Sequence, residues 1–489
     1  MLFGSLFFLT AFLPVALGGH WALQLAADAA ARRRGGVPSA VPANAWLLFA
    51  NAFFCAFGDP GALALLAVSG WANRAVARRL SRIGPTRGGK ALLAAAVTGD
   101  LAVLGAFKYA GFFAASANAL FGAGLPVPDL WLPLGVSFWT FREISALADC
   151  ARGDARVPPL LEWFVWLSLF PVLVSGPIAR LGDTAAALRS RPFSAPLAAS
   201  GLRRFFVGLA KKALVADTLA PVADAAWEAA DGGGLPRPLA ALALLAYALQ
   251  LYFDFSGYTD MAVGLGRMLG LRLPENFDHP YASASVREFW RRWHATLGSW
   301  LRDYLYFPLG GSRCGTLRTC VNTLVVFAVC GLWHGAGAMF LLWGLWHGLC
   351  IVAERLAPRV EPRGAAGAAA LAAFRHAWTL AAVLFGWALF RSPDAATAGT
   401  FLRSLAGVAE ISDASRALWI DWSPKAVAAL ALGAAFSFPV VPRLRAALRR
   451  RLPEGAAWWL ESAAASALAL LAAFFLAGSS FRSFLYFKF

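Results

Sequence analysis

The chain has 489 residues, of which 59% are hydrophobic and 15% are charged. Soluble proteins carry roughly 25% charged residues and disordered chains are poor in apolar ones, so the composition argues against both classes. The chain contains 44 basic and 27 acidic residues, which gives a net charge of +17. Because the basic residues lie between apolar runs rather than on one polar face, they indicate a polytopic membrane protein with basic loops and disfavour nucleic-acid binding.

Thirteen apolar runs approach the length of about 20 residues that a membrane-spanning helix needs. They cover residues 2–17, 44–71, 91–114, 129–147, 160–178, 203–221, 238–255, 257–271, 319–333, 336–353, 371–390, 426–441 and 457–478. Some runs are short, so we expect about eleven true spans, with the others re-entrant or interfacial. The first run lacks a basic start, which favours a retained helix over a cleaved signal peptide. The stretches between runs have the length of loops, which predicts one integral membrane domain over residues 1–489.

Arginine-rich stretches interrupt the apolar runs at residues 32–34, 74–90 and 443–451. Loops of this kind stay in the cytoplasm, so the three stretches give a loose prediction of orientation. The six cysteines form no CxxC pair and have no histidine at zinc-site spacing. We expect them to pack as small apolar side chains, with no disulfide framework and no metal site.

Polar residues concentrate in a central block from Arg287 to Arg318, which holds six arginines, two acids and several aromatic residues. On a continuous helix over residues 287–302, at about 100° per residue, the tryptophans and leucines form one stripe and the arginines the opposite face. His294 then falls on the seam between the two faces. The pattern predicts an amphipathic helix at the membrane interface, with a wet, cationic surface that suits an anionic ligand.

His334 lies in an apolar run beside the glycines Gly331, Gly335 and Gly337. An ionisable side chain within a membrane segment is costly and is therefore a functional hypothesis. The glycines allow another helix, or a thin ligand, to approach the backbone closely. A structural histidine bonded to a neighbouring carbonyl is the alternative that the residues alone leave open.

His347 repeats the local pattern of His334, because Leu345–Gly348 and Leu332–Gly335 both read Leu-Trp-His-Gly. A spacing of 13 residues turns a continuous helix by about 220° after whole turns. The two imidazoles would then face nearly opposite ways, and at most one of them would share a site with His294. The remaining histidines are expected in turns, in loops or at the edges of spans.

Isolated histidines restrict the chemistry that the chain can perform. The sequence has no HExxH motif, no nucleophile elbow, no Walker A loop and no dinucleotide-binding fingerprint. Histidine titrates near neutrality and can take a proton from an attacking hydroxyl. Such general-base catalysis accelerates a reaction roughly 10²–10⁴-fold. A buried base that faces an activated acyl group would support acyl transfer to an alcohol. A transporter or acyl-group conduit is the alternative, since broken helices and charges within the membrane suit it as well.

Residues 289–313 carry the most specific pattern of the chain, from Phe-Trp-Arg-Arg-Trp-His through Leu-Arg-Asp-Tyr-Leu-Tyr to Pro-Leu-Gly-Gly-Ser-Arg. With an ordered series of further motifs, this stretch resembles the membrane-bound O-acyltransferase superfamily and, within it, the bacterial alginate O-acetyltransferase branch. The further motifs are Leu132–Phe138, Ser175–Ile178, Gly208–Asp217, Tyr252–Met261, Pro274–Phe277, Leu332–Gly335 and Leu485–Phe489. The series is far more specific than any one of its members.

The resemblance implies an all-α polytopic fold, a ring of transmembrane helices around a central tunnel, with a catalytic core over about residues 130–355. His334 matches the superfamily's general base, and His294 matches its second active-site position. Other matched positions are expected to line the substrate site or the tunnel. They are Arg291, Arg292, Arg302, Asp303, Tyr304, Trp333, Asp254 and Asn276.

The same resemblance implies a multi-pass O-acetyltransferase of the bacterial inner membrane that binds no resident cofactor. Acetyl-CoA or another acetyl thioester would enter from the cytoplasm as the donor, and the arginine block would favour its phosphates. The acetyl group would reach an extracytoplasmic polysaccharide such as alginate, directly or through partner proteins. A D-alanyl transferase that uses a carrier-protein donor is the alternative within the superfamily. The Phe-Trp-Arg-Arg-Trp-His block and the Leu-Tyr-Phe ending favour the acetyl branch.

Overall fold

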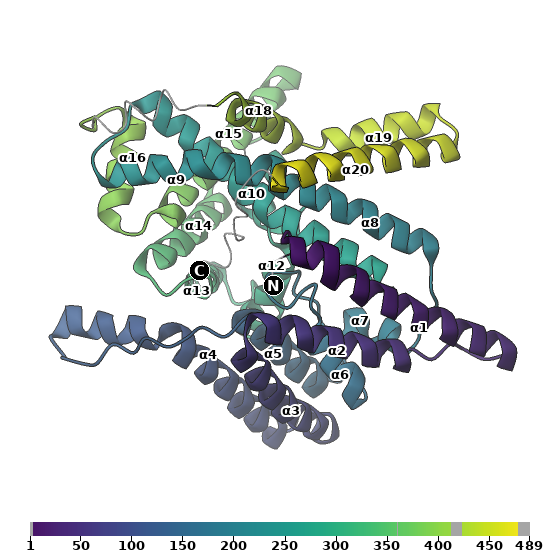
Figure 1. Ribbon diagram of the computed structural model, residues 1–489. Helices are drawn as coiled ribbons and strands as arrows, with labels where there is room; N and C mark the ends of the chain where they lie inside the picture. The colour runs from purple at the N-terminus through teal and green to yellow at the C-terminus, as the bar shows by residue number, and fades with distance from the viewer. Residues whose placement is uncertain (1–2, 359, 412–422, 478–489) are drawn as a thin grey trace. The chain divides into compact units, whose positions relative to one another are not determined.

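The computed structural model describes residues 3–358, 360–411 and 423–477 (Figure 1). Within these residues the regular elements are helices, and one isolated bridge joins Gly234 to Ile411. The predicted all-α membrane architecture is therefore confirmed. The chain forms two compact units, Met1–Phe205 with Tyr258–Glu275, and Phe206–Gly257 with Asn276–Phe489. The motif predicted at Leu485–Phe489 lies outside the described residues.

Helices with short connections build the first unit. Its elements are η1 (Phe8–Phe12), α1 (Leu13–Arg34), α2 (Val41–Gly58), α3 (Pro60–Ile83), α4 (Arg87–Phe121), α5 (Val136–Arg152), α6 (Leu160–Ser168), α7 (Leu181–Arg189), the first part of α8 (Ala195–Ala210) and the last part of α10 (Arg237–Met268). Asp59 joins α2 to α3 and caps α3, because its side chain accepts the Ala62 N–H at 2.9 Å. Pro60 presets the backbone of the first turn of α3. The two helices therefore form a hairpin with a single connecting residue.

Residues 169–179 follow α6 as a buried segment without helix. Buried backbone groups need hydrogen-bond partners, and polar side chains of neighbouring helices provide them. Asn51 of α2 accepts the Phe170 N–H at 3.0 Å, and Arg142 of α5 donates to the carbonyls of Leu167, at 3.1 Å, and Trp166. The apolar run 160–178 is thus a short helix of nine residues followed by an irregular, well-anchored segment.

The second unit contains the end of α8, most of α10 and the remaining helices. These are η2 (Lys211–Ala216), α9 (Asp217–Asp231), η3 (Pro280–Ala282), α11 (Val286–Arg292), α12 (Ala295–Leu301), η4 (Arg302–Tyr306), α13 (Thr316–His334), α14 (Ala338–Leu356), α15 (Gly364–Arg391), α16 (Ala395–Ala406), α18 (Pro424–Phe436), α19 (Val440–Arg451) and α20 (Glu454–Ala477). Trp227 of α9 ties three of them together: its ring stacks on Phe401 of α16 at 4.1 Å, and its Nε1 donates to Ser392, which directly follows α15, at 3.1 Å.

Eight helices in the described part of the chain are long and apolar enough to cross a membrane, or up to nine if the bent pair α18 and α19 forms one span. They are Phe8–Arg34, Val41–Gly58, Arg87–Phe121, Arg237–Met268, Thr316–His334, Ala338–Leu356, Gly364–Arg391 and Glu454–Leu476. The expected number was about eleven. The runs 238–255 and 257–271 fall largely on one helix, α10, and the runs 129–147 and 160–178 form helices of 17 and 9 residues. The run 203–221 is divided among α8, η2 and α9.

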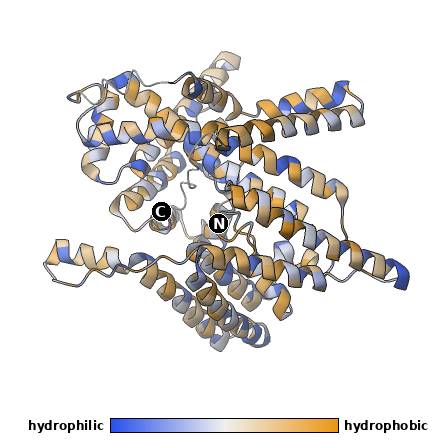
Figure 2. Ribbon diagram, viewed as in Figure 1, coloured by the Kyte–Doolittle hydropathy of each residue, from blue (hydrophilic) through white to orange (hydrophobic). Residues whose placement is uncertain are grey.

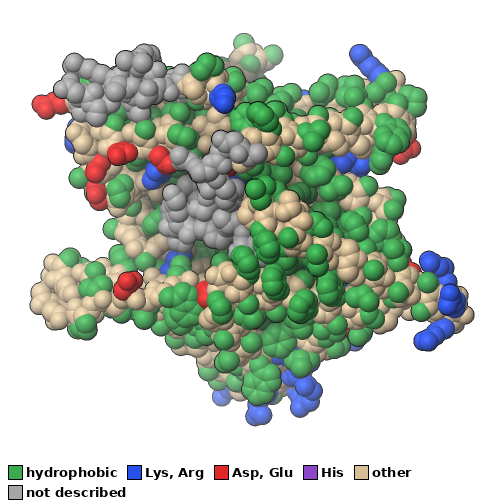
Figure 3. Space-filling model, viewed as in Figure 1, with side chains coloured by type: hydrophobic (Ala, Val, Ile, Leu, Met, Phe, Trp, Pro, Cys, Tyr) green, Lys and Arg blue, Asp and Glu red, His purple; other side chains and the backbone are tan. Residues whose placement is uncertain are grey.

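The exterior has the composition expected of a lipid-facing protein. Hydrophobic residues predominate along the helices, and hydrophilic residues gather at the far end of α1, where Arg32, Arg33 and Arg34 form the last turn (Figure 2). On the face drawn in Figure 3, hydrophobic side chains cover most of the helices, and lysines and arginines gather near helix ends. This separation suits helices whose middles lie in hydrocarbon and whose ends reach water.

Helices α13 and α14 form a tight antiparallel hairpin, joined by the three residues between His334 and Ala338. A Cβ atom built on Gly344 would lie 2.2 Å from the Phe327 carbonyl oxygen, and one on Gly331 would lie 2.2 Å from the Phe340 carbonyl oxygen. The glycines therefore let the two backbones touch, which confirms the close approach expected at Gly331. The hairpin also reverses the direction of the chain directly after His334.

The continuous amphipathic helix expected over residues 287–302 is wrong. Helix α11 ends at Arg292, Trp293 is extended, and His294 has a left-handed backbone with φ 44° before α12 begins at Ala295. The ring of His294 is consequently buried rather than on a wet seam. Trp290 and Leu297 therefore belong to two separate helices, α11 and α12, and do not share one helical stripe.

Candidate active site

His294 is held in an uncommon conformation that needs compensation from its surroundings. A left-handed backbone costs an L-residue other than glycine free energy, and it persists where neighbouring contacts stabilise it. Asn276 provides those contacts: its carbonyl oxygen accepts the Ala295 N–H at 3.0 Å, and its side chain lies against the two residues on either side of Ala295. The segment between α10 and α11 therefore fixes the start of α12.

The side-chain oxygen of Asn276 determines the tautomer of His294. It accepts the Thr296 N–H at 3.2 Å and the Thr296 hydroxyl at 2.9 Å, so it is the acceptor end of the amide. His294 Nδ1 lies 3.2 Å from the same oxygen and must therefore carry the proton. Nε2 is then the nitrogen with the lone pair, which makes it the hydrogen-bond and proton acceptor of the ring.

His294 is fully buried among aromatic rings. Phe255 of α10 meets it edge to face at 4.8 Å, and Trp333 of α13 lies 6.0 Å away. Burial lowers the pKa of His294, because the charged imidazolium loses its water. The ring is therefore neutral at neutral pH, the state that a proton acceptor requires.

His334 is the last residue of α13 and is 4% exposed. Aromatic rings surround it edge to face, with centroid distances of 5.0 Å to Trp333, 5.0 Å to Trp343 and 5.5 Å to Phe390. The hairpin explains this enclosure, because α14 folds back and brings Trp343 against the end of α13. Trp333 contacts both His334 and His294, so the fold gathers the two predicted histidines around one indole ring.

The predicted arginines have acidic partners close in sequence. Arg292 Nη2 donates to Glu288 at 2.7 Å. Arg302 forms a bidentate ion pair with Asp303, in which Nε and Nη2 donate to the two carboxylate oxygens at 2.7 and 3.1 Å. Arg291 is exposed on α11. In these contacts the guanidinium groups face carboxylates of their own elements rather than the imidazoles. The sequence pattern placed His294 on the seam between the arginine face and the apolar face, whereas the structure buries its ring.

Asp254 belongs to a buried ion cluster on α10. Lys212 of η2 lies 2.6 Å from Asp254 and 2.7 Å from Asp217, and both Lys212 and Asp254 have side chains 3% exposed. A lysine this deep in protein needs carboxylate partners. The next residue, Phe255, contacts His294. Asp254 thus fixes the helix segment that forms one wall of the histidine site.

Three residues of the site have no signal of their own in the sequence. Thr296 shares Asn276 with His294, Phe255 packs against His294, and Trp343 packs against His334. Tyr304, which was predicted for the tunnel, packs on Trp300 at 5.3 Å within the α12–η4 segment. A threonine or an aromatic residue in an apolar chain is too common to single out, so these positions became visible through their contacts.

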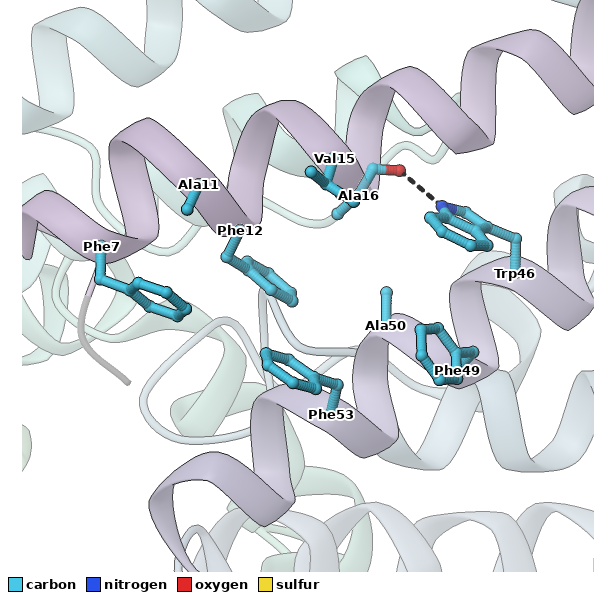
Figure 4. A pocket seen from close by; sticks show the side chains of 9 residues that line it. All are labelled: Phe7, Ala11, Phe12, Val15, Ala16, Trp46, Phe49, Ala50 and Phe53. Atoms are coloured by element: carbon cyan, nitrogen blue, oxygen red, sulfur yellow. Dashed lines mark hydrogen bonds between the residues drawn. The ribbon is translucent and has the colours of Figure 1, made fainter.

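A cavity of about 230 Å³ belongs to the first unit, and none of its lining residues is one of the histidine-site residues. Its lining residues come from η1 and α1 and the residue before them on one side and from α2 on the other (Figure 4): Phe7, Ala11, Phe12, Val15, Ala16, Trp46, Phe49, Ala50 and Phe53. The one side-chain nitrogen, Trp46 Nε1, donates to the Ala16 carbonyl at 2.9 Å. With no titratable group in its wall, the cavity suits a hydrocarbon chain and cannot supply acid–base catalysis.

Residues 129–361 match the sequence model of the membrane-bound O-acyltransferase family. A protein of Azotobacter vinelandii named "Probable alginate O-acetylase AlgI" is 38% identical over 400 residues, which are 81% of this chain and 76% of that protein. The protein of the same name from Pseudomonas aeruginosa is 37% identical over 429 residues, 85% of this chain and 77% of that protein.

More distant relatives carry other acceptors in their names. The "Peptidoglycan O-acetyltransferase" of Helicobacter pylori is 32% identical over 383 residues, 73% of this chain and 70% of that protein. The "Teichoic acid D-alanyltransferase" of Bacillus subtilis is 28% identical over 222 residues, 43% of this chain and 55% of that protein. The names of these relatives describe transfer of an acetyl or D-alanyl group that involves alginate, peptidoglycan or teichoic acid.

Proposed function

Because the chain belongs to the membrane-bound O-acyltransferase family and is a multi-pass membrane O-acyltransferase, we propose that it transfers acetyl groups to a polysaccharide outside the cytoplasm. The observation that carries the proposal is the histidine pair: a neutral His294, held in one tautomer by Asn276, shares the Trp333 ring with His334. Two enclosed imidazoles in an aromatic, water-poor setting suit proton transfer during acyl transfer.

In the proposed reaction His334 acts as the general base. Its imidazole takes the proton of an acceptor hydroxyl while the hydroxyl oxygen forms a bond to the thioester carbonyl carbon. When the tetrahedral intermediate collapses, the carbon–sulfur bond breaks and the leaving thiolate takes that proton back from the imidazolium. The products are the acetyl ester and the free thiol, and the base returns to its starting state.

His294 serves the same reaction through Nε2. This nitrogen is an acceptor in the tautomer that Asn276 fixes, so it cannot donate directly to an oxyanion. A water molecule that donates one hydrogen to Nε2 can donate the other to the oxyanion, which stabilises the charge that develops in the transition state. Through this water His294 would assist the step that His334 initiates.

The donor and the acceptor follow from the relatives and from charge. Acetyl-CoA is the proposed donor, because a cationic arginine block suits its phosphates and the most similar relatives reported above are named as O-acetylases. Alginate is the proposed acceptor, reached directly or through polysaccharide-acetylating partner proteins, with the chain in the bacterial inner membrane. The D-alanyl relative matches at lower identity and over less than half of this chain, which favours acetyl transfer.

The test is reconstitution of the purified protein in liposomes with radiolabelled acetyl-CoA and an alginate oligosaccharide. The wild-type protein should move label onto the acceptor hydroxyls. His334→Ala should lower the rate by about 10²–10⁴, the value of a general base. His376→Ala is the matched control, because His376 binds the Ser283 carbonyl with its Nδ1, away from the pair, and should retain activity.

Three outcomes would contradict the proposal, and each would correct a different part of it. Full activity of His334→Ala would remove His334 from the mechanism. Label that crosses the bilayer as free acetate or acetyl-CoA, with none on the acceptor, would identify a conduit instead of a transferase. If the acceptor receives label from D-alanyl carrier protein and none from acetyl-CoA, the donor is the carrier protein and not acetyl-CoA.

A further inference from the structure

His347 is a buried histidine that the proposed mechanism does not use. It lies in the middle of α14, its side chain is completely buried, and neither ring nitrogen has a hydrogen-bond partner among the described residues. Burying a polar ring without hydrogen bonds in a membrane helix costs free energy that phenylalanine or leucine would not cost. An imidazole at this position therefore calls for a reason beyond packing.

Four aromatic rings pack around His347. Trp290 of α11 meets it at 5.2 Å and Trp343 at 5.3 Å, both edge to face, while Phe289 stacks parallel to it at 6.4 Å. Trp387 of α15 lies at 6.2 Å. The indole Nε1 atoms of Trp290 and Trp343 also have no hydrogen-bond partner in the described structure. The rings thus meet His347 edge to face, stacked or tilted, and edge-to-face and offset-stacked pairs are the arrangements that aromatic quadrupoles favour.

Trp343 connects this cluster to the proposed base. Its ring meets His334 at 5.0 Å with an interplanar angle of 89°, and meets His347 at 5.3 Å with an angle of 74°. Both histidines thus pack against one indole, His334 from the end of α13 and His347 from the middle of α14. The opposite orientation expected for a continuous helix does not apply, because the chain breaks after His334 and α14 folds back along α13.

The position of His347 is rigid. A Cβ atom built on Gly386 of α15 would lie 2.5 Å from His347 Nε2, so the ring fills the space that this glycine leaves. On the same helix as His347, Gly344 touches the Phe327 carbonyl of α13. A ring wedged between α14 and α15 can transmit its orientation to the indole that it touches, since packed interiors resist displacement.

We propose that His347 is a positioning residue for His334, and that it acts through the Trp343 ring which both imidazoles contact. His347 holds the plane of Trp343, and Trp343 in turn holds the His334 ring at the angle from which it takes the hydroxyl proton. The proposal rests on the proposed function of His334, but it makes a separate claim about the geometry of that ring. It assigns His347 no contact with substrate.

The first test is a double-mutant cycle on acetyl transfer. His347→Leu and Trp343→Phe should each lower kcat by about 10–100-fold with little change in KM, as expected when a residue that orients a functional imidazole is lost. If His347 acts through Trp343, the double variant should be no slower than Trp343→Phe alone. His347→Phe keeps a flat ring and should recover part of the loss.

The matched control is Trp346→Phe, on the residue beside His347. Trp346 packs on Phe385 and donates to the Ala382 carbonyl, away from His334, so this variant should keep kcat. Three outcomes would overturn the proposal. The loss of kcat in the double variant could equal the product of the two single losses, a variant could raise KM and leave kcat unchanged, or His347→Leu could keep full activity. Size-exclusion profiles and thermal unfolding in detergent identify a variant that fails to fold, and His347→Phe then replaces His347→Leu in the cycle.

A second readout does not depend on acetyl transfer at all. Diethyl pyrocarbonate modifies neutral imidazoles, and peptide mass spectrometry gives the rate at each histidine. His347→Phe should change the rate at His334 severalfold and leave His376 unchanged. An unchanged rate at His334 would refute the positioning role even if the wild-type protein transfers acetyl groups. A changed rate in a protein that transfers none would keep the positioning role and refute the proposed function.

Discussion

At the scale of single residues, the site depends on one amide. Asn276 accepts three hydrogen bonds on its side-chain oxygen, two from Thr296 and one from His294, and a fourth on its backbone carbonyl. This set stabilises the left-handed backbone of His294 and selects the tautomer with the proton on Nδ1. The basicity of His294 Nε2 is therefore a property of Asn276 as much as of the histidine itself.

Replacing Asn276 with aspartate should shift the pH dependence of acetyl transfer. Asn276→Asp keeps the shape and the acceptor atoms, but a carboxylate beside the ring favours the imidazolium and raises the pKa of His294. Since the neutral ring is the active form, the acidic limb of the kcat/KM profile should move to higher pH. Thr296→Val, which removes one donor to Asn276 and adds no charge, should leave the limb in place. An unmoved limb in Asn276→Asp would show that His294 does not titrate in catalysis.

At the scale of elements, the hairpin of α13 and α14 and the ion cluster on η2 and α10 hold the walls of the site. The hairpin works because glycines allow backbone contact, as at Gly331 and Gly344. The cluster works because Lys212 neutralises part of the charge of Asp217 and Asp254 within a buried, apolar setting. Each device fixes a helix that carries a ring against His294 or His334.

Gly344→Ala should destabilise the protein and lower its activity. The added methyl group would lie 2.2 Å from the Phe327 carbonyl oxygen, so α14 must move away from α13. Overpacking of this kind costs about 1–3 kcal/mol, and thermal unfolding in detergent measures it. Gly337→Ala is the control, because its methyl group would have an ordinary contact of 3.5 Å with Phe340. Equal melting temperatures for the two variants would contradict the close contact.

Lys212→Met should be strongly destabilising. It leaves the buried Asp254 and the partly buried Asp217 without this cation, and breaking a buried ion pair in this way costs about 3–5 kcal/mol. Adding Asp254→Asn to Lys212→Met should restore part of the stability, because one of the uncompensated charges is then gone. Lys425→Met, which removes a cation from the face of Phe475, should have a small effect. No recovery in the double variant would mean that Lys212 stabilises the fold by some route other than its charge.

At the scale of the whole molecule, the basic stretches predict how the chain threads the membrane. Residues 32–34 end α1, and residues 74–90 end α3 and begin α4. Between them lies the α2–α3 hairpin, with Asp59 as its single connecting residue. If both stretches stay in the cytoplasm, α3 must cross the membrane although its arginines keep it out of the set of apolar spans. Its 24 residues extend about 36 Å, which is enough.

Cysteine labelling in cells tests this threading. In a chain whose own cysteines are replaced, Gly36→Cys and Gly88→Cys should resist a membrane-impermeant maleimide, because they lie beside the basic stretches. Ala123→Cys, just beyond the far end of α4, should react from outside. All three positions are exposed, so a difference reports the side of the membrane. Labelling of Gly88→Cys from outside would place α3 on the membrane surface.

Composition and local motifs were sufficient to predict the class of this protein and to single out His294 and His334. Apolar runs of span length and basic loops required a membrane protein, and the pattern from residue 289 to residue 313 with the later Leu-Trp-His-Gly pointed to acyl transfer. These features are local, since hydropathy and motif spacing are properties of the chain in order. His334 could be predicted because a histidine in an apolar run is costly wherever the run lies.

The tertiary structure decided where the side chains meet. Helical periodicity assumed that residues 287–302 and the two Leu-Trp-His-Gly repeats lie on straight helices, and the breaks at His294 and after His334 invalidate that assumption. The break at His294 depends on Asn276, 18 residues away, and the contact of His347 with Trp343 and Trp290 depends on the hairpin. Long-range hydrogen bonds and backbone contacts at glycines set both, and neither follows from the period of the sequence.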